Sequence, residues 1–151
     1  MLKINRQTDY AVRVILALAK EGEGARLSSG TIQREMLIPP ALMLRIVARL
    51  AHAGLVNTFP GREGGMALSR PASQITLRDA VEAFEGPILL SECMQTKGEE
   101  DCPFRSDCPV RSKWGRVQVA MLREMAAITF ESLAQEALGV PLKLPSPSMS
   151  F

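Results

Sequence analysis

Histidine and aromatic residues are scarce in this chain of 151 residues, which has a single histidine and an aromatic fraction of 5%. So few aromatic side chains argue against a protein that binds single-stranded nucleic acid by stacking its bases. The one histidine, His52, has no recognisable serine, cysteine or carboxylate partner for nucleophilic catalysis, so nothing in the sequence recommends an enzyme. We assign His52 no role.

Long apolar runs and a secretory start are also missing. No stretch reaches the roughly 18 to 20 apolar residues of a membrane-spanning helix. The opening residues, MLKINRQTDYAVRV, lack the apolar core of a signal peptide. We therefore expect a cytoplasmic protein without a membrane partner, whose length suits one main domain or a small module with an appended dimerisation element.

Cysteine occurs only three times, at Cys93, Cys102 and Cys108. An odd number of cysteines in a chain expected in the cytoplasm does not form a disulfide framework. All three lie in a polar stretch, residues 88–109, where thiolates can converge on a metal such as an iron–sulfur cluster or copper(I). Zinc fits poorly, because it normally takes a fourth cysteine or a nearby histidine. A metal-free thiol switch with a Cys102–Cys108 disulfide is the alternative.

Charge is unevenly distributed along the chain. Residues 1–74 hold ten Lys or Arg against five Asp or Glu, whereas residues 75–151 hold eight against eleven. A basic first half suits a polyanion such as nucleic acid. The alternative is that both halves are solvated surface.

The first half of the chain has the periodicity of a winged helix. Apolar spacing, capping residues and prolines predict helices over residues 5–20, 28–37 and 40–54. Two short extended runs, LVNTF and MALSR, are joined by the glycine-rich turn PGREGG and predict a β-hairpin. Three helices followed by a hairpin are typical of a winged helix-turn-helix.

The second half is predicted to be helical on both sides of the cysteine stretch. Helical patterns cover residues 76–86, 109–127 and 129–138. In the longest of these, apolar residues recur at spacings of three and four, which favours pairing with another helix. These residues, which we call the long-helix seam, are Val110, Trp114, Val117, Met121, Met125 and Ile128.

The predicted fold is therefore mostly α with a small β-hairpin wing. We expect a winged helix-turn-helix DNA-binding domain over residues 1–74. Residues 75–138 are expected to supply a linker helix, the cysteine loop and a long C-terminal dimerisation helix. Residues 139–151 are expected to form a flexible tail.

The helix predicted over residues 40–54 is the candidate recognition helix, because the second helix of a helix-turn-helix presents its N-terminal residues to base edges in the major groove. Arginines there can reach guanine edges or phosphates, and apolar side chains can touch thymine methyl groups. An arginine in the wing can enter a minor groove. The predicted DNA-binding residues are Pro40, Ala41, Leu42, Arg45, Arg49, Gly61 and Arg62. The alternative is a solvated helix with two outward arginines.

These segments together resemble a family of winged-helix regulators that includes IscR and NsrR. The resemblance is carried by TDYAVRVILALA, RLAHAGLV, the glycine-rich wing, ITLRDAVEAFEG, and CPFRSDC followed by a long helix, and it covers residues 1 to about 138. It implies a homodimeric transcription regulator that binds double-stranded operator DNA. It also implies that Cys93, Cys102 and Cys108 hold an iron–sulfur cluster.

The NsrR type implies a fourth ligand, an aspartate near the N-terminus of the other subunit, and Asp9 falls on that position. The IscR type uses a histidine three residues beyond the last cysteine, where this chain has Arg111. Alternatively, Asp9 is a first-turn acid favoured by the helix dipole. Resemblance to the NsrR type favours [4Fe-4S] over [2Fe-2S] and implies a repressor that senses nitric oxide, redox state or iron.

Three features depart from the family pattern. The gap between Cys93 and Cys102 is longer than in the best-known members. Pro60 stands where relatives often have an arginine that leads the wing, which leaves that contact to Arg62. Leu44 occupies the recognition-helix position at which IscR has a glutamate. The conformation of the cysteine loop and the DNA sequence that the protein binds are therefore not inferred from the relatives.

Overall fold

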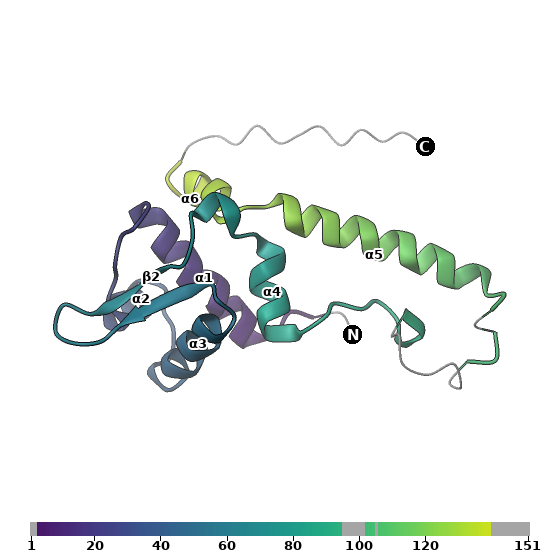
Figure 1. Cartoon of the computed structure of the whole chain (residues 1–151), viewed down its shortest axis with the longest axis horizontal. Coiled ribbons are helices and arrows are strands. Elements are labelled where there is room, and N and C mark those ends of the chain that lie inside the picture. Colours follow the sequence, from purple (N-terminus) through teal and green to yellow (C-terminus); the bar gives the residue numbers. More distant parts are fainter. Residues whose placement is uncertain (1–2, 95–101, 105, 140–151) are drawn as a thin grey trace.

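The computed structural model describes residues 3–94, 102–104 and 106–139, and Figure 1 shows their arrangement. The elements in chain order are α1 (Arg6–Glu21), α2 (Ser29–Glu35), α3 (Pro40–His52), β1 (Val56–Phe59), β2 (Gly65–Leu68), η1 (Ala72–Gln74), α4 (Leu77–Glu85), η2 (Glu92–Met94), α5 (Pro109–Ala127) and α6 (Phe130–Ala137). This order confirms the mostly helical fold with a hairpin wing. The predicted tail lies, from residue 140 onward, outside the described residues.

Helix α1 lies at the centre of the body. It begins after Asn5, whose side chain accepts a hydrogen bond from the backbone N–H of Thr8 at 2.9 Å. Ala11, Val14 and Ile15 are fully buried, and their spacing of three and four places them on one face of the helix. α6, α4, α3, α2 and β2 all pack against this helix.

The helix-turn-helix follows from two local signals. Ser28 caps α2, because its hydroxyl oxygen accepts a hydrogen bond from the backbone N–H of Thr31 at 3.1 Å. Pro40 occupies the first turn of α3, where a proline needs no hydrogen-bond partner. α3 then buries four apolar side chains toward the core, as the sequence predicts. They are Met43, Ile46, Val47 and Leu50.

The wing is a two-stranded antiparallel hairpin in which Val56 pairs with Leu68 and Phe59 with Gly65. Leu27 extends it through a bridge to Met66, with hydrogen bonds in both directions. Gly65 has a φ of 127°, and a Cβ at this position would lie 2.5 Å from the carbonyl oxygen of Leu27. The close approach of Leu27 therefore requires a glycine here.

The hydrophobic core runs across the predicted domain boundary at residue 74. Ile75 and Phe130 are both fully buried in it. The backbone N–H of Phe130 donates to the carbonyl of Ile75 at 2.9 Å, and that of Leu77 donates to the carbonyl of Ile128 at 2.8 Å. These hydrogen bonds join the segment after α5 to the segment before α4. Helix α6 then packs against α1. The division into two domains stays a prediction.

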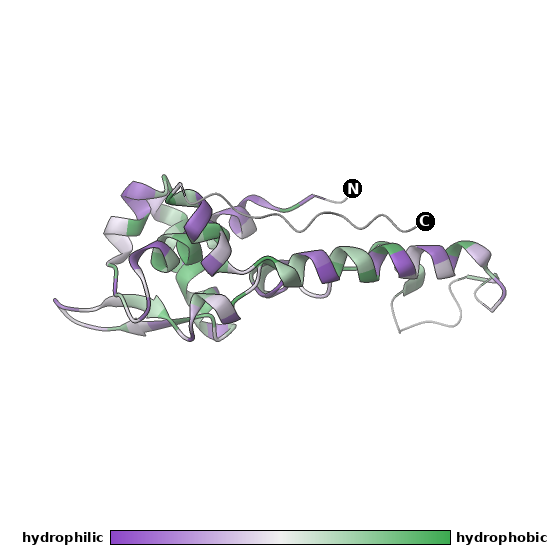
Figure 2. Ribbon diagram, turned by 90° about the horizontal axis from the view of Figure 1, so that it is seen from above, coloured by the Kyte–Doolittle hydropathy of each residue, from purple (hydrophilic) through white to green (hydrophobic). Residues whose placement is uncertain are grey.

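Helix α5 extends from the body as an arm (Figure 1), and hydrophobic residues recur along it (Figure 2). None of its residues is buried. Val110, Trp114 and Val117 of the long-helix seam are 54%, 44% and 52% exposed.

In the described part of the chain, no helix combines the length and apolar character needed to cross a membrane.

Glu85, at the end of α4, ties that helix to the start of α1. Its Oε1 accepts a hydrogen bond from the hydroxyl of Thr8 at 2.6 Å and another from the backbone N–H of Asn5 at 3.0 Å. Thr8 is fully buried. The Thr8 hydroxyl, followed by the Asn5 N–H, holds the pKa of Glu85 below its ordinary value.

We expect Glu85→Gln to change the response of the fold to acid. Because the folded-state pKa is lowered, the ionised carboxylate stabilises the fold above the unfolded-state value of about 4.3, and this stabilisation is lost as the pH falls through the folded-state pKa. The difference in free energy of unfolding between wild type and Glu85→Gln is therefore expected to shrink between about pH 7 and about pH 3. Chemical denaturation at both pH values measures it, and an unchanged difference contradicts the role of the charge.

Candidate DNA interface and cysteine site

Helix α3 and the wing border one groove. α2, α3 and the hairpin surround a cavity of about 350 Å³, lined by Pro40 and Leu44 of α3 and by Thr58 and Phe59 of β1, among others. The guanidinium of Arg26 stacks over the Phe59 ring at 3.6 Å. The fold therefore places the start of the candidate recognition helix beside the hairpin.

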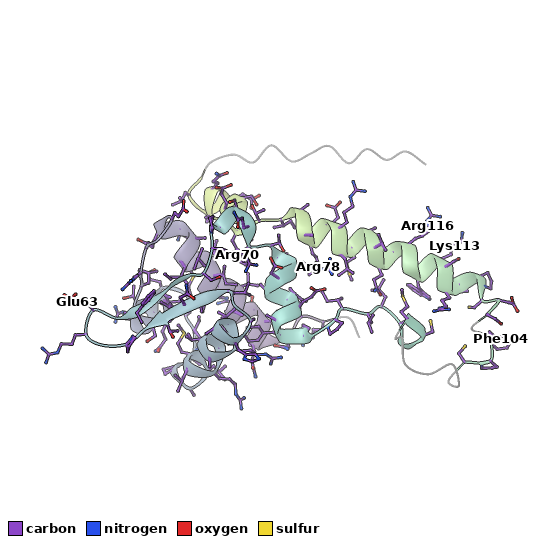
Figure 3. The ribbon with its side chains drawn as sticks, in the orientation of Figure 1. Glu63, Arg70, Arg78, Phe104, Lys113 and Arg116 are labelled. Carbon is purple, nitrogen blue, oxygen red and sulfur yellow. The ribbon has the colours of Figure 1, made fainter. Side chains whose placement is uncertain are left out.

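The predicted DNA-binding residues have different surroundings. Pro40, Ala41 and Arg45 are exposed on α3, and Arg45 makes no hydrogen bond or ion pair with any described residue. Leu42 is half-buried and packs against the core. Gly61 and Arg62 are exposed in the turn between β1 and β2, and Glu63 beside them marks the tip of the wing (Figure 3).

Arg49 differs from Arg45, because its guanidinium faces α4. Its Nε donates to the carbonyl of Ala83 at 3.0 Å, and its Nη2 donates to the carbonyl of Phe84 at 2.9 Å. It also lies over the Phe84 ring at 4.9 Å. Carbonyls in the last turn of a helix lack partners within the helix and carry partial negative charge. Arg49 thus joins the candidate recognition helix α3 to the end of α4, and DNA contact by Arg49 stays an untested prediction.

Three neutral hydrogen-bond donors in the groove were not found from the sequence. They are Ser29, Gln33 and Thr58, and all three line the cavity beside α3. Hydroxyl and amide groups are common partners of phosphate oxygens in protein–DNA contacts. Ser29 follows the capping residue Ser28 at the start of α2, and this position is the signal that could have found it.

Asp9 lies in the first turn of α1, where its Oδ2 accepts a hydrogen bond from Nη2 of Arg13 at 2.8 Å. Nη1 of Arg13 donates to the carbonyl of Met36 at 3.2 Å. Met36 is the residue that caps the C-terminus of α2. One arginine therefore links Asp9 to the turn between α2 and α3. The side chain of Asp9 is still 45% exposed, so it remains accessible to a second partner.

The cysteines are distributed along the segment between α4 and α5. Cys93 lies in η2, Cys102 lies in the loop, and Cys108 is the residue that precedes α5. All three are half-buried free thiols. Among the residues that the structure describes, no three His, Cys, Asp or Glu side chains form a group that could hold a metal ion. The predicted ligands are thus not assembled within one chain.

The first part of the cysteine segment is attached to α5. The backbone N–H of Leu90 donates to Oε1 of Gln118 at 3.1 Å. Met94 reaches α5 at Gly115, where an added Cβ would lie 3.8 Å from the Met94 methyl carbon. Figure 3 shows Phe104, which lies between Cys102 and Cys108, at the far end of α5, whereas Glu63 lies at the opposite end of the molecule. The cysteine loop and the wing of one chain are therefore far apart.

A model of one family, Rrf2, described as an iron-dependent transcriptional regulator, matches residues 4–136. The chain belongs to the Rrf2 family. This confirms the resemblance to winged-helix regulators, and the Rrf2 chain is accordingly a transcriptional regulator.

Relatives of this Rrf2 chain include protein aau3 of Rhizobium meliloti, which is 34% identical over 135 residues, covering 89% of this chain and 86% of that protein. The HTH-type transcriptional regulator NsrR of Oceanobacillus iheyensis is 26% identical over 132 residues, covering 87% of this chain and 89% of NsrR. CymR, the global cysteine regulator of B. subtilis, has a similar structure, with a TM-score of 0.72 and 27% identity. That match covers 90% of this chain and 98% of CymR.

The two arginines of α3 are expected to respond differently to substitution. Arg45→Ala removes an exposed side chain, so it is expected to leave the free energy of unfolding unchanged and to weaken DNA binding by about 1 to 3 kcal/mol if Arg45 contacts a base. Arg49→Ala removes two hydrogen bonds to α4 and is expected to lower the free energy of unfolding by about 1 to 2 kcal/mol. Denaturation, together with titration of a duplex selected by the wild type, measures both. If Arg45→Ala and Arg49→Ala lower the free energy of unfolding equally, the assigned roles are wrong.

Proposed function

We propose that this Rrf2 protein is a homodimeric repressor that binds operator DNA through α3 and the wing and responds through an iron–sulfur cluster held by Cys93, Cys102 and Cys108. The observation that carries the proposal is the position of the chain's only three cysteines, all free thiols, on the segment that joins α4 to α5. Thiolates are the usual ligands of iron–sulfur clusters. Partial exposure of all three thiols gives a signal molecule access to them.

The proposed signals are nitric oxide, redox state and iron supply. When bound, an iron–sulfur cluster supplies a redox-active, nitric-oxide-sensitive group that depends on available iron. Three thiolates leave one ligand position of the cluster open, and we propose that the partner subunit's Asp9 occupies this position. The NsrR-like pattern of Asp9 with CPFRSDC favours [4Fe-4S] over [2Fe-2S] in this proposal.

The α5 arm supports the proposed homodimer. The exposed apolar residues of the long-helix seam are typical of a helix that packs against a second helix. Met121 and Met125 of this seam also line a cavity of about 700 Å³ between α4, the segment around residues 87–90 and α5. A second copy that crosses at α5 can fill this space and can bring its cysteine loop near the start of α1.

Two contacts offer routes from the sensor to the DNA interface. Arg13 bonds both to Asp9 and to the end of α2, so a change of partner at Asp9 alters the support of the turn before α3. Arg49 bonds to the last carbonyls of α4, which leads directly into the cysteine segment. Both contacts place a charged side chain between the proposed sensor and the recognition helix.

A metal-free thiol switch is the second candidate. One chain assembles no metal-binding group among its described residues, and the chain resembles CymR, a cysteine regulator. In this candidate, Cys102 and Cys108 lose two electrons and two protons to an oxidant and form a disulfide. The new bond changes the loop before α5 without any metal.

Protein purified without oxygen is expected to be brown and to contain iron and sulfide. Cys93→Ala, Cys102→Ala and Cys108→Ala are each expected to abolish the visible absorption. Ser91→Ala is a matched control, because the Ser91 hydroxyl lies 3.1 Å from the Cys93 sulfur but supplies no thiolate. Removal of the cluster is expected to lower DNA affinity by about 5- to 150-fold, the usual range of coupling between two sites.

The measurements are the visible spectrum, iron and sulfide analysis, and titration of the selected duplex. Four irons per chain support [4Fe-4S] and two support [2Fe-2S]. A single variant that keeps full iron and sulfide excludes that cysteine as an essential ligand. Colourless, iron-free protein that loses DNA binding when Cys102 and Cys108 are oxidised contradicts the cluster and supports the thiol switch.

A further inference from the structure

The outward face of α3 is apolar apart from one arginine. Ala41, Leu44, Arg45 and Ala48 are exposed and follow the spacing i, i+3, i+4 and i+7, so they lie on one side of the helix. Leu44 is 82% exposed, the largest value among the exposed large hydrophobic residues that the structure describes. A single exposed leucine is ordinary, but an apolar row on a recognition helix is a candidate contact surface.

The side chains of α3 restrict which bases this helix can read. From Pro40 to His52 it contains no Asn, Gln, Ser, Thr, Asp or Glu. In the major groove, adenine is read by Asn or Gln and cytosine by Asp or Glu, whereas guanine is read by Arg or Lys and the thymine methyl group by apolar contact. Because Nε and Nη2 of Arg49 bond to α4, Arg45 is the better placed of the two arginines to read guanine. The other outward positions have the chemistry to contact thymine.

The surroundings of Leu44 favour DNA as its partner. Leu44 lines the same groove as Ser29, Gln33 and Thr58, whose hydroxyl and amide groups suit phosphate oxygens. The first 74 residues also carry an excess of positive charge, ten basic against five acidic residues. From Ala41 to Ala48 the helix rises about 10 Å, close to three base-pair steps of about 3.4 Å each. Leu44 lies near the middle of this span.

We propose that Leu44 is a specificity-determining residue that contacts the 5-methyl group of a thymine in the major groove. Ala41 and Ala48 extend this apolar contact, and Arg45 reads a neighbouring guanine. The proposal rests on the DNA binding proposed above and deepens it, because it names the base and the chemical group that are recognised. Deoxyuridine lacks only this methyl group, so it isolates the proposed contact from base pairing.

Duplexes that the full-length protein selects from a random-sequence library serve as the probe. Each thymine of a selected duplex is replaced singly by deoxyuridine, and the dissociation constant is measured each time. We expect one thymine in each half-site at which the replacement weakens binding by about fourfold, the effect of burying one methyl-sized group. Leu44→Ala is expected to bind the thymine and deoxyuridine duplexes equally.

Leu138→Ala is the matched control, because Leu138 is also strongly exposed but lies after α6, away from α3. It is expected to keep both the affinity and the fourfold discrimination of the wild type. If the wild type binds every deoxyuridine duplex as tightly as the thymine duplex, methyl recognition is wrong while DNA binding stands. If Leu44→Ala keeps the discrimination, the role of Leu44 is wrong. If no duplex is selected at all, the proposed DNA binding fails as well.

Discussion

Burial of α1 is the constraint on which the rest of the structure depends. Ala11, Val14 and Ile15 are inaccessible to solvent, and full burial of one Val or Ile side chain stabilises a fold by about 1.5 to 3 kcal/mol. Helices α2 and α3 and strand β2 of the candidate DNA interface pack against this same helix, as does α4, which leads into the cysteine segment. Because Asp9 lies at the start of α1, the proposed sensor contact acts directly on the helix against which α3, the candidate recognition helix, packs.

Among the described residues, the long-helix seam of α5 and the outward face of α3 are both apolar and exposed, and we propose a different partner for each. The long-helix seam on α5 has the spacing of a helix–helix contact and adjoins a large cavity, which suits a second copy of the chain. The outward face of α3 is narrower, contains Arg45, and adjoins neutral donors, which suits the edge of a DNA duplex. Charge and neighbouring groups, and not exposure alone, distinguish the two surfaces.

The helices and the wing could be predicted from the sequence because their boundaries depend on local signals. Asn5 and Ser28 cap helices, Pro40 starts one, and glycines form the wing turn. The partner of Arg49 could not be predicted, since its two bonds join residues 34 and 35 positions apart. The packing of α6 against α1 could not be predicted either, because these two helices are also far apart in the sequence. The short η2 helix had no periodicity to reveal it.

The candidate sites were predictable only in part. The Asp9–Arg13 pair has the i, i+4 spacing of a helical ion pair and could have been found in the sequence. The second hydrogen bond of Arg13, to the carbonyl of Met36, could not be predicted, because it depends on how α1 packs against α2. The grouping of Leu44 with Thr58 in one groove likewise depends on the approach of the wing to α3. Residue types indicated the chemistry, whereas packing decided which residues share a surface.

The central proposal is that the three cysteines of one chain act together with Asp9 of the other chain. Mixed dimers with Asp9→Ala in one chain and Cys93→Ala in the other test this most directly. If Asp9 acts across the dimer, one site keeps all its ligands and the other loses two. The mixed dimer is then expected to show the wild-type visible spectrum at about half its intensity. A spectrum that is only the average of those of the two variant homodimers contradicts the account.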